Sequence, residues 1–199
     1  MIKTIIFDLG GVCFNINWKK IDEEMKEKFG ISSLVRTYGR DIQELYEDAS
    51  VGKKTMKEVF EKICEGKDLN VDEVVNYYKE LYKKYKNLNE EIFILIKNLK
   101  DKIRVVCLTD TNEVHFQAHE EQNHLSCFDE CFASFQLGIN KLNKDIFKII
   151  IDKLNLKPEE IIFVDDSQEK VDNAKSFGIN GIKFENIEQL KIELNKFGV

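Results

Sequence analysis

Aspartate residues follow two apolar segments that lie far apart in the sequence. Asp8 comes directly after Thr4–Phe7, and Asp165 and Asp166 form an adjacent pair at the end of Ile161–Val164. Neighbouring carboxylates repel one another unless a cation or hydrogen bonds relieve them. A hard divalent ion such as Mg²⁺, which takes oxygen ligands, is the usual solution. The pattern predicts a cation site, although Asp8 could cap a turn and the pair could be an N-cap followed by a solvated charge.

Three apolar runs have the composition of buried strands: Thr4–Phe7, Arg104–Leu108 and Ile161–Val164. Continuous apolar runs without alternation suit parallel strands that are covered on both faces. The second run also ends in polar residues, Thr109 and Asp110. Because the ligand crevice of an open parallel sheet lies beyond the carboxyl ends of its strands, we expect the polar residues at these three ends to converge there.

Residues between these runs show helical periodicity. Four amphipathic stripes fall between Asn15 and Lys86, and four short helices can form a small bundle of their own. From Asn89 onward, helical and strand patterns alternate. We therefore predict an α/β fold with a doubly wound parallel sheet. Its core domain comprises residues 1–14 and 87–199, and a helical cap domain comprises residues 15–86.

Four motifs, in order, resemble those of the haloacid dehalogenase superfamily, which has a Rossmann-like core and, in many members, a small helical C1 cap. They are FDLGGV near the start, LTDTN from Leu108, S-x-x-x-G-x-x-K from Ser134 to Lys141, and FVDDS from Phe163. The run K-x-N-x-D-I-F, which begins at Lys141, resembles the third motif of a bacterial subgroup that includes α-D-glucose-1-phosphate phosphatases. The resemblance covers nearly the whole chain.

The resemblance implies a catalytic or substrate-binding role for five residues. Asp8 would be the nucleophile that attacks phosphorus and forms an aspartyl-phosphate intermediate. Thr109 would donate hydrogen bonds to a phosphate oxygen, and Lys141 would neutralise charge on the phosphoryl group and orient Asp8. Gly10 and Asp110 would contribute to substrate binding beside Thr109 and Lys141.

The resemblance also implies Mg²⁺ as the cofactor. Asp8, Asp165 and the backbone carbonyl of Gly10 would hold the ion, and Asp166 would bind it through water or position the other ligands. The activity implied is that of a Mg²⁺-dependent phosphatase. Its substrate would be a small phosphorylated metabolite, a sugar phosphate such as a hexose 1-phosphate.

Four positions depart from the family's pattern. Gly10 stands where most phosphatases of the superfamily have a second Asp that acts as general acid and base. An anomeric sugar oxygen leaves more readily than an ordinary alcohol, which fits a sugar 1-phosphate substrate. Asp110 stands where the subgroup often has Asn, Leu142 replaces Pro, and Lys170 replaces Asn. A catalytically weak binding or regulatory protein is therefore an alternative, and a metal-independent dehalogenase, which would not need the paired carboxylates, is a third.

Two further clusters of residues could be functional or could have an ordinary structural role. His115, His119, His124, Cys127 and Cys131 include an i, i+4 histidine pair that could bind zinc, or they could belong to an ordinary surface helix and loop. Four tyrosines could stack against a sugar, but helical spacing favours packing within the cap: Tyr77, Tyr78, Tyr82 and Tyr85. Residues 79–86 are rich in Lys, which indicates a solvated helix face.

Composition limits the partners. The chain has 199 residues and a net charge of −6, and all but three of its 30 basic residues are Lys, a balance that disfavours nucleic acid. No apolar stretch approaches the roughly 18 residues of a membrane span, and the first apolar run is too short for a signal peptide. We expect a cytoplasmic protein with reduced cysteines, and either a monomer or a weak dimer.

Overall fold

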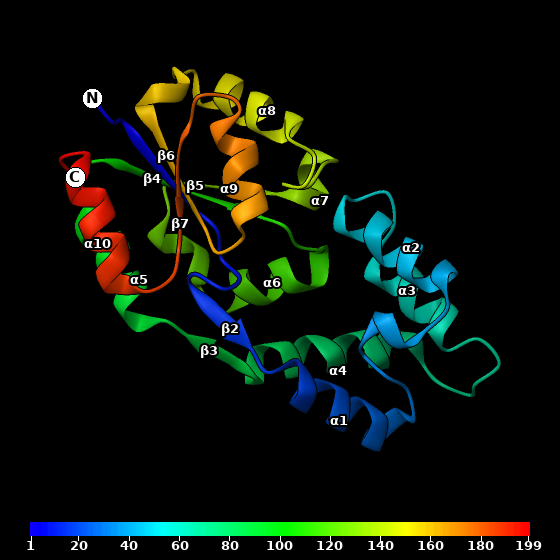
Figure 1. Cartoon of the computed structure of the whole chain (residues 1–199). Coiled ribbons are helices and arrows are strands. Elements are labelled where there is room, and N and C mark those ends of the chain that lie inside the picture. The colour runs from blue at the N-terminus through cyan, green and yellow to red at the C-terminus, as the bar shows by residue number, and fades with distance from the viewer.

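The computed structural model describes residues 1–199 and is built around a five-stranded parallel sheet (Figure 1). The strands are β1 (Thr4–Phe7), β4 (Arg104–Thr109), β5 (Glu130–Ala133), β6 (Ile161–Asp165) and β7 (Asn180–Lys183). Their order in the sheet is β5-β4-β1-β6-β7, which places β1 at the centre. The three strands predicted from apolar runs are therefore direct neighbours.

Helices cover both faces of the sheet. They are α5 (Glu90–Lys100), α6 (Glu113–Glu121), α7 (Ser134–Leu137), α8 (Asp145–Leu154), α9 (Gln168–Lys175) and α10 (Ile187–Lys196). Ile5 and Phe7 of β1 belong to the apolar cluster that contains α5, α6 and α10, whereas Ile6 belongs to the cluster that contains α8 and α9. Burial on both faces explains why Ile5, Ile6 and Phe7 of β1 are all apolar.

Four helices form a cap between the first and second strands of the central sheet. They are α1 (Trp18–Phe29), α2 (Arg40–Ser50), α3 (Met56–Ile63) and α4 (Val71–Lys84). Local signals define their ends, because Asn70 caps α4 and Thr55 with Glu58 forms a capping box at α3. Gly30 ends α1 in the left-handed conformation. The fold class, a doubly wound parallel sheet with a four-helix cap, is confirmed.

A two-stranded antiparallel ribbon joins the cap to the core. Its strands are β2 (Phe14–Ile16) and β3 (Lys86–Leu88), which pair Phe14 with Leu88 and Ile16 with Lys86. The sequence did not predict this ribbon, because three-residue strands carry no readable period. The solvated helix face predicted for residues 79–86 is wrong at its end, since α4 stops at Lys84 and Lys86 lies half-buried in β3.

The cap contacts the core chiefly through α4 and α6. The hydroxyl groups of Tyr78 and Tyr82 lie 2.9 and 3.0 Å from Nε2 of His115 and of His119. Elsewhere, Ser134 Oγ of the core donates to the Ser50 carbonyl of the cap at 2.7 Å. These polar contacts join the cap to the core at the carboxyl ends of the strands, and Figure 1 shows α4 of the cap beside α6 of the core. None of the helices combines the length and the apolar character that crossing a membrane requires.

Candidate active site

Parallel register brings the polar ends of the central strands together. Phe7 of β1 pairs with Cys107 of β4 on one side and with Val164 of β6 on the other. Asp8 and Asp165, which follow Phe7 and Val164, are therefore adjacent, and Thr109 ends β4 beside them. The convergence expected from the sequence follows directly from this register.

Lys141 is completely buried between two of these carboxylates. Its Nζ lies 2.7 Å from Asp8 Oδ1, 2.7 Å from Asp165 Oδ2 and 3.1 Å from the Leu108 carbonyl. Burial acts to lower the pKa of Lys141, but the charges of Asp8 and Asp165 outweigh it and raise the pKa above its ordinary value. The lysine therefore stays protonated and draws the two carboxylates to one point.

Asp8 is held through one of its two carboxylate oxygens. Oδ1 accepts the Leu9 amide at 2.7 Å and faces Lys141, whereas Oδ2 receives no hydrogen bond from the protein. Burial raises the pKa of Asp8 to about 6, because the charge of Lys141 only partly offsets the loss of solvent and Asp165 adds repulsion. Near neutral pH the carboxylate is charged, oriented and free at Oδ2.

The three predicted metal-binding carboxylates form one acidic cluster. Ligand oxygens of Asp8, Asp165 and Asp166 all lie within 4.8 Å of one another. Burial and the neighbouring charge of Asp165 raise the pKa of Asp166, so this carboxylate also lacks full compensation within the protein. Hard oxygen ligands with excess negative charge fit Mg²⁺, the cofactor that the sequence predicted.

Gly11 allows Asp166 to approach the loop after β1. Gly11 has φ +80°, and a Cβ placed on it would overlap the Asp166 carboxylate. Gly10, in contrast, has open space where a Cβ would lie. The two glycines therefore differ in function: Gly11 is required for close packing of the acidic cluster, whereas a side chain fits at Gly10.

Asp110 lies next to the cluster but is paired elsewhere. Its Oδ1 accepts the backbone N–H of Lys141 at 2.9 Å, and its Oδ2 lies 3.0 Å from Lys170 Nζ. The carboxylate therefore fixes the loop that carries Lys141.

All seven site residues predicted from the sequence lie in this one region of the structure: Asp8, Gly10, Thr109, Asp110, Lys141, Asp165 and Asp166.

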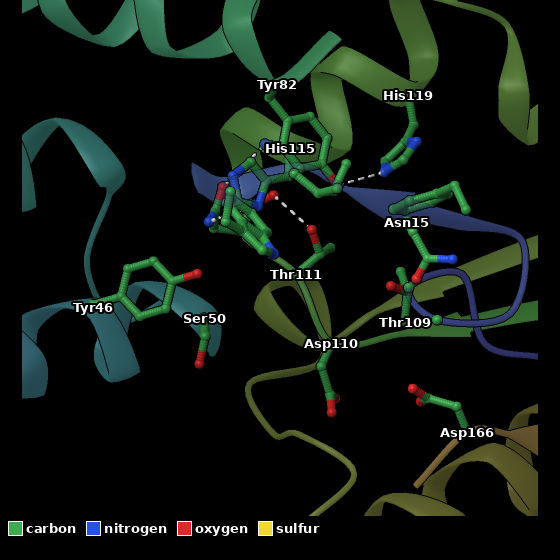
Figure 2. A pocket seen from close by; sticks show the side chains of 16 residues that line it. Asn15, Tyr46, Ser50, Tyr82, Thr109, Asp110, Thr111, His115, His119 and Asp166 are labelled. Carbon is green, nitrogen blue, oxygen red and sulfur yellow. Dashed lines mark hydrogen bonds between the residues drawn. The ribbon is translucent and has the colours of Figure 1, made fainter. Parts of the chain in front are cut away.

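A cavity of about 520 Å³ lies between this region and the cap (Figure 2). Gly10, Thr109 and Asp166 line its core end. Aromatic and imidazole side chains line its cap end: Trp18, Tyr46, Tyr82, His115 and His119. The volume lies in the range of roughly 300–1,000 Å³ that small-molecule sites occupy.

Helical spacing favours packing over sugar stacking for Tyr82, but the structure places this residue at the cap side of the cavity. Tyr46 and Asn15 also line the cavity, and no motif in the sequence marks them as site residues. Figure 2 shows these side chains at the cavity, with Tyr46 from α2 and Asn15 from β2. Only the contact of the cap with the core brings them near Thr109, and no local motif records that contact.

The histidine and cysteine cluster does not fit a zinc site. Both ring nitrogens of His115 face protein partners, Asn112 and Tyr78, and those of His119 face Lys86 and Tyr82. Burial lowers the pKa of His115 to about 3 and that of His119, with help from Lys86, to about 2, so both rings are neutral. These histidines join the cap to the core.

A capped α/β enzyme with carboxylates at its strand ends is the class of protein that this fold and site define. Within that class, the chain belongs to the haloacid dehalogenase-like hydrolases, a family that matches residues 2–178. The resemblance noted in the motifs is thereby confirmed for the family. The subgroup that contains glucose-1-phosphate phosphatases stays a prediction.

Two named relatives align with at least 98% of this chain. D-ribitol-5-phosphate phosphatase of Bacteroides thetaiotaomicron is 25% identical over 206 residues, which cover 98% of this chain and 97% of that protein. Drimenol cyclase of Aspergillus calidoustus is 24% identical over all of this chain, which spans only 37% of that protein.

Two solved structures share the fold. A haloacid dehalogenase family enzyme of Bacteroides thetaiotaomicron, in complex with magnesium and inorganic phosphate, superposes with a TM-score of 0.78 at 22% identity, over 93% of this chain and 95% of that one. A protein of Porphyromonas gingivalis described as a predicted haloacid dehalogenase-like family hydrolase has a TM-score of 0.78 at 27% identity, over 99% of this chain and 98% of that one.

Proposed function

We propose that this protein hydrolyses the phosphate monoester of a small metabolite, a sugar phosphate such as a hexose 1-phosphate, through an aspartyl-phosphate intermediate. The observation that carries the proposal is the position of Asp8, whose Oδ1 is fixed by Lys141 and Leu9 while Oδ2 stays free. A buried carboxylate with one oriented, unbonded oxygen is suited to nucleophilic attack.

The reaction has two steps at Asp8. Oδ2 attacks phosphorus and the bond from phosphorus to the leaving oxygen breaks, which transfers the phosphoryl group to the carboxylate. Water then attacks the same phosphorus, releases inorganic phosphate and restores Asp8. Lys141 keeps its charge in both steps, because its raised pKa holds the proton, and it offsets negative charge that develops beside it.

The remaining predicted residues position the phosphate. Thr109 lines the cavity beside Gly10, where its hydroxyl and the next backbone N–H donate to a phosphoryl oxygen. Mg²⁺, held by Asp8, Asp165, Asp166 and the Gly10 carbonyl, would when bound neutralise charge on the phosphoryl oxygens. Asp110 accepts the backbone N–H of Lys141 and so fixes the loop that carries this lysine beside the substrate.

Two features support a sugar as the leaving group. The cap end of the cavity offers the faces of Trp18, Tyr46 and Tyr82, and aromatic rings pack well against the carbon face of a sugar. The pKa values of His115 and His119 keep both rings neutral there, so the site suits an uncharged polyol. The name of the ribitol-5-phosphate phosphatase, which this chain resembles, also supports a polyol phosphate.

The test is a substrate panel with Mg²⁺: glucose 1-phosphate, glucose 6-phosphate, ribitol 5-phosphate and a 2-haloacid. We expect Asp8-dependent release of phosphate with the highest kcat/KM for the 1-phosphate. Asp8→Asn should abolish turnover, whereas Asp152→Asn, on the exposed face of α8, should not change it.

Other results would redirect the proposal. A preference for ribitol 5-phosphate would replace the hexose as substrate class but keep the chemistry. Absence of turnover that depends on Asp8 would favour a catalytically weak binding protein, and halide release would favour a dehalogenase.

A further inference from the structure

The core end of the cavity holds no group that is free to protonate a leaving alcohol. Asp166 lines this end, but it belongs to the acidic cluster that would hold Mg²⁺, and a bound cation would keep its carboxylate charged. Position 10 has no side chain, Asp8 is the nucleophile, and Lys141 is bonded to three acceptors. Asp110 is paired with Lys170. A leaving alkoxide needs a proton, so the donor has to come from the cap side of the cavity.

Tyr82 is the cap-side hydroxyl that connects to a proton source. Its hydroxyl lies 3.0 Å from His119 Nε2, and His119 Nδ1 lies 3.0 Å from Lys86 Nζ (Figure 2 shows the first of these contacts). An ammonium group can only donate, so Nδ1 of the neutral ring accepts and Nε2 carries the hydrogen. The Tyr82 oxygen then accepts from Nε2, which leaves its own hydrogen free for a ligand in the cavity.

We propose that Tyr82 donates the proton to the leaving oxygen of the substrate, and that Lys86 resupplies this proton through His119. This inference rests on the proposed phosphatase function. The Tyr82 O–H bond breaks as the leaving O–H bond forms, His119 Nε2 passes its hydrogen to Tyr82, and Lys86 passes one to His119 Nδ1. The net change is that one ammonium becomes an amine, one alkoxide becomes an alcohol, and the hydrogen of the neutral His119 ring moves from Nε2 to Nδ1.

The surroundings of Lys86 suit this role. It is half-buried and faces no carboxylate; its neighbours are His119, Gln122 at 2.9 Å and His124 at 3.5 Å, with the Tyr82 ring 4.9 Å away. Burial, and then repulsion by Lys83, lowers the pKa of Lys86 to about 7. The ammonium can therefore release a proton near neutral pH and recover it from solvent.

A second tyrosine–histidine pair in the same interface lacks this connection. Tyr78 contacts His115 Nε2 at 2.9 Å, but His115 Nδ1 faces the amide of Asn112, which supplies no proton. Tyr78 is also fully buried and does not line the cavity. Tyr78→Phe is therefore a matched control for Tyr82→Phe, since both remove a hydroxyl that bonds a histidine of α6.

The experiment compares two leaving groups in each variant. 4-Nitrophenolate leaves without a proton, whereas a sugar alkoxide needs one. For Tyr82→Phe we expect kcat/KM for the sugar phosphate to fall by about 10²-fold or more, the usual loss with a general acid, and kcat/KM for 4-nitrophenyl phosphate to change by less than about threefold. Tyr78→Phe should change the two substrates equally.

Lys86→Arg tests the proton source by pH, because arginine keeps the charge but does not release a proton. We expect wild-type kcat/KM for the sugar phosphate to fall above about pH 7, and this limb to be absent in the variant. Gly10→Asp in the Tyr82→Phe background should restore turnover of the sugar phosphate, because the space at position 10 accepts a side chain.

Parallel losses on both substrates, or no loss on either, would overturn the relay and leave Tyr82 with a structural role. If Tyr82→Phe does not fold, the pH profile of Lys86→Arg is the remaining test. A fall of kcat/KM above about pH 7 that is the same in Lys86→Arg as in the wild type would overturn the proposal. If wild-type protein shows no Asp8-dependent turnover of either ester, the proposed function fails instead.

Discussion

Lys170 Nζ lies 3.0 Å from Asp110 Oδ2, so two departures from the family's pattern form an ion pair with each other. Each residue replaces an uncharged Asn of the resembling subgroup, and each alone would change the charge beside the phosphate end of the cavity. Together they cancel. Because the pair is largely buried, water and salt screen it less than they screen a surface pair. The net charge of the site is therefore preserved although both positions differ.

Loss of only one partner should weaken substrate binding. Lys170→Gln leaves the Asp110 carboxylate unpaired next to an anionic substrate, and we expect kcat/KM to fall about tenfold, equivalent to about 1.4 kcal/mol. The double variant Asp110→Asn, Lys170→Gln should recover to within about threefold. Lys175→Gln, on the exposed side of the same helix, is the control. Equal losses in the single and double variants would contradict charge compensation.

Removal of the Lys141 charge should destabilise the protein. Lys141→Met leaves Asp8 and Asp165 as two buried carboxylates without their shared cation, and we expect a loss of about 3–5 kcal/mol in the free energy of unfolding. Urea denaturation without metal measures it, with the exposed Lys144→Met as control. Mg²⁺ should stabilise the variant more than the wild type. A neutral effect at position 141 would show that the lysine is not the main compensating charge.

The protonation of Asp8 should make stability depend on pH. Its pKa rises from 3.8 to about 6 on folding, chiefly by burial, so the folded state binds the proton more tightly than the unfolded state. Stabilisation by this group is full below about pH 4 and is lost as pH rises through 6.

This dependence is measured as the difference in unfolding free energy between wild-type protein and Asp8→Asn. Without metal, the difference should fall by on the order of 2 kcal/mol between pH 4 and 6, and by about 3 kcal/mol over the whole titration, because one pKa unit corresponds to about 1.4 kcal/mol. Saturating Mg²⁺ should reduce the fall, since a cation favours the carboxylate. A difference that stays flat across this window would contradict the raised pKa.

A side chain at Gly11 should weaken metal binding. Gly11→Ala combines a left-handed φ of +80° with overlap of the Asp166 carboxylate, and we expect Mg²⁺ affinity to fall at least about tenfold as this ligand is displaced. Calorimetric titration with Mg²⁺ measures it. Gly30→Ala has φ +66° and open space, so it separates backbone strain from displacement of Asp166. The same loss in both variants would rule out a specific effect on Asp166.

A side chain at Gly52 should displace the cap. Gly52 has φ +74°, and its Cβ would overlap the backbone carbonyl of Phe135 in the core. Since Ser50, the last residue of α2 and two positions before Gly52, lines the cavity, we expect Gly52→Ala to raise KM about threefold or more with a smaller change in kcat. Gly66→Ala, with φ +76° and no neighbour, is the control. An unchanged KM would mean that the cap tolerates the shift.

Much of the core was predictable because its signals are local. The runs that became β1, β4 and β6 are apolar at nearly every position, and the helical and strand patterns predicted to alternate from Asn89 onward do so in the structure. β5 was missed, because Glu130–Ala133 mixes polar and apolar residues and is only partly buried. Short edge strands of this kind are defined by pairing with a neighbour, which a single segment does not reveal.

The site divides in the same way. The sequence by itself determined which polar residues follow each apolar strand, including the carboxylates Asp8, Asp165 and Asp166. Each apolar run and the direction of the chain indicate these residues locally. Only the tertiary structure decided that Asp110 is neutralised by Lys170 and that Tyr82, His119 and Lys86 form a chain of contacts at the cavity. Those contacts join residues more than 30 positions apart and depend on how the cap packs against α6. Packing of this kind is a property of whole surfaces, so no short motif specifies it.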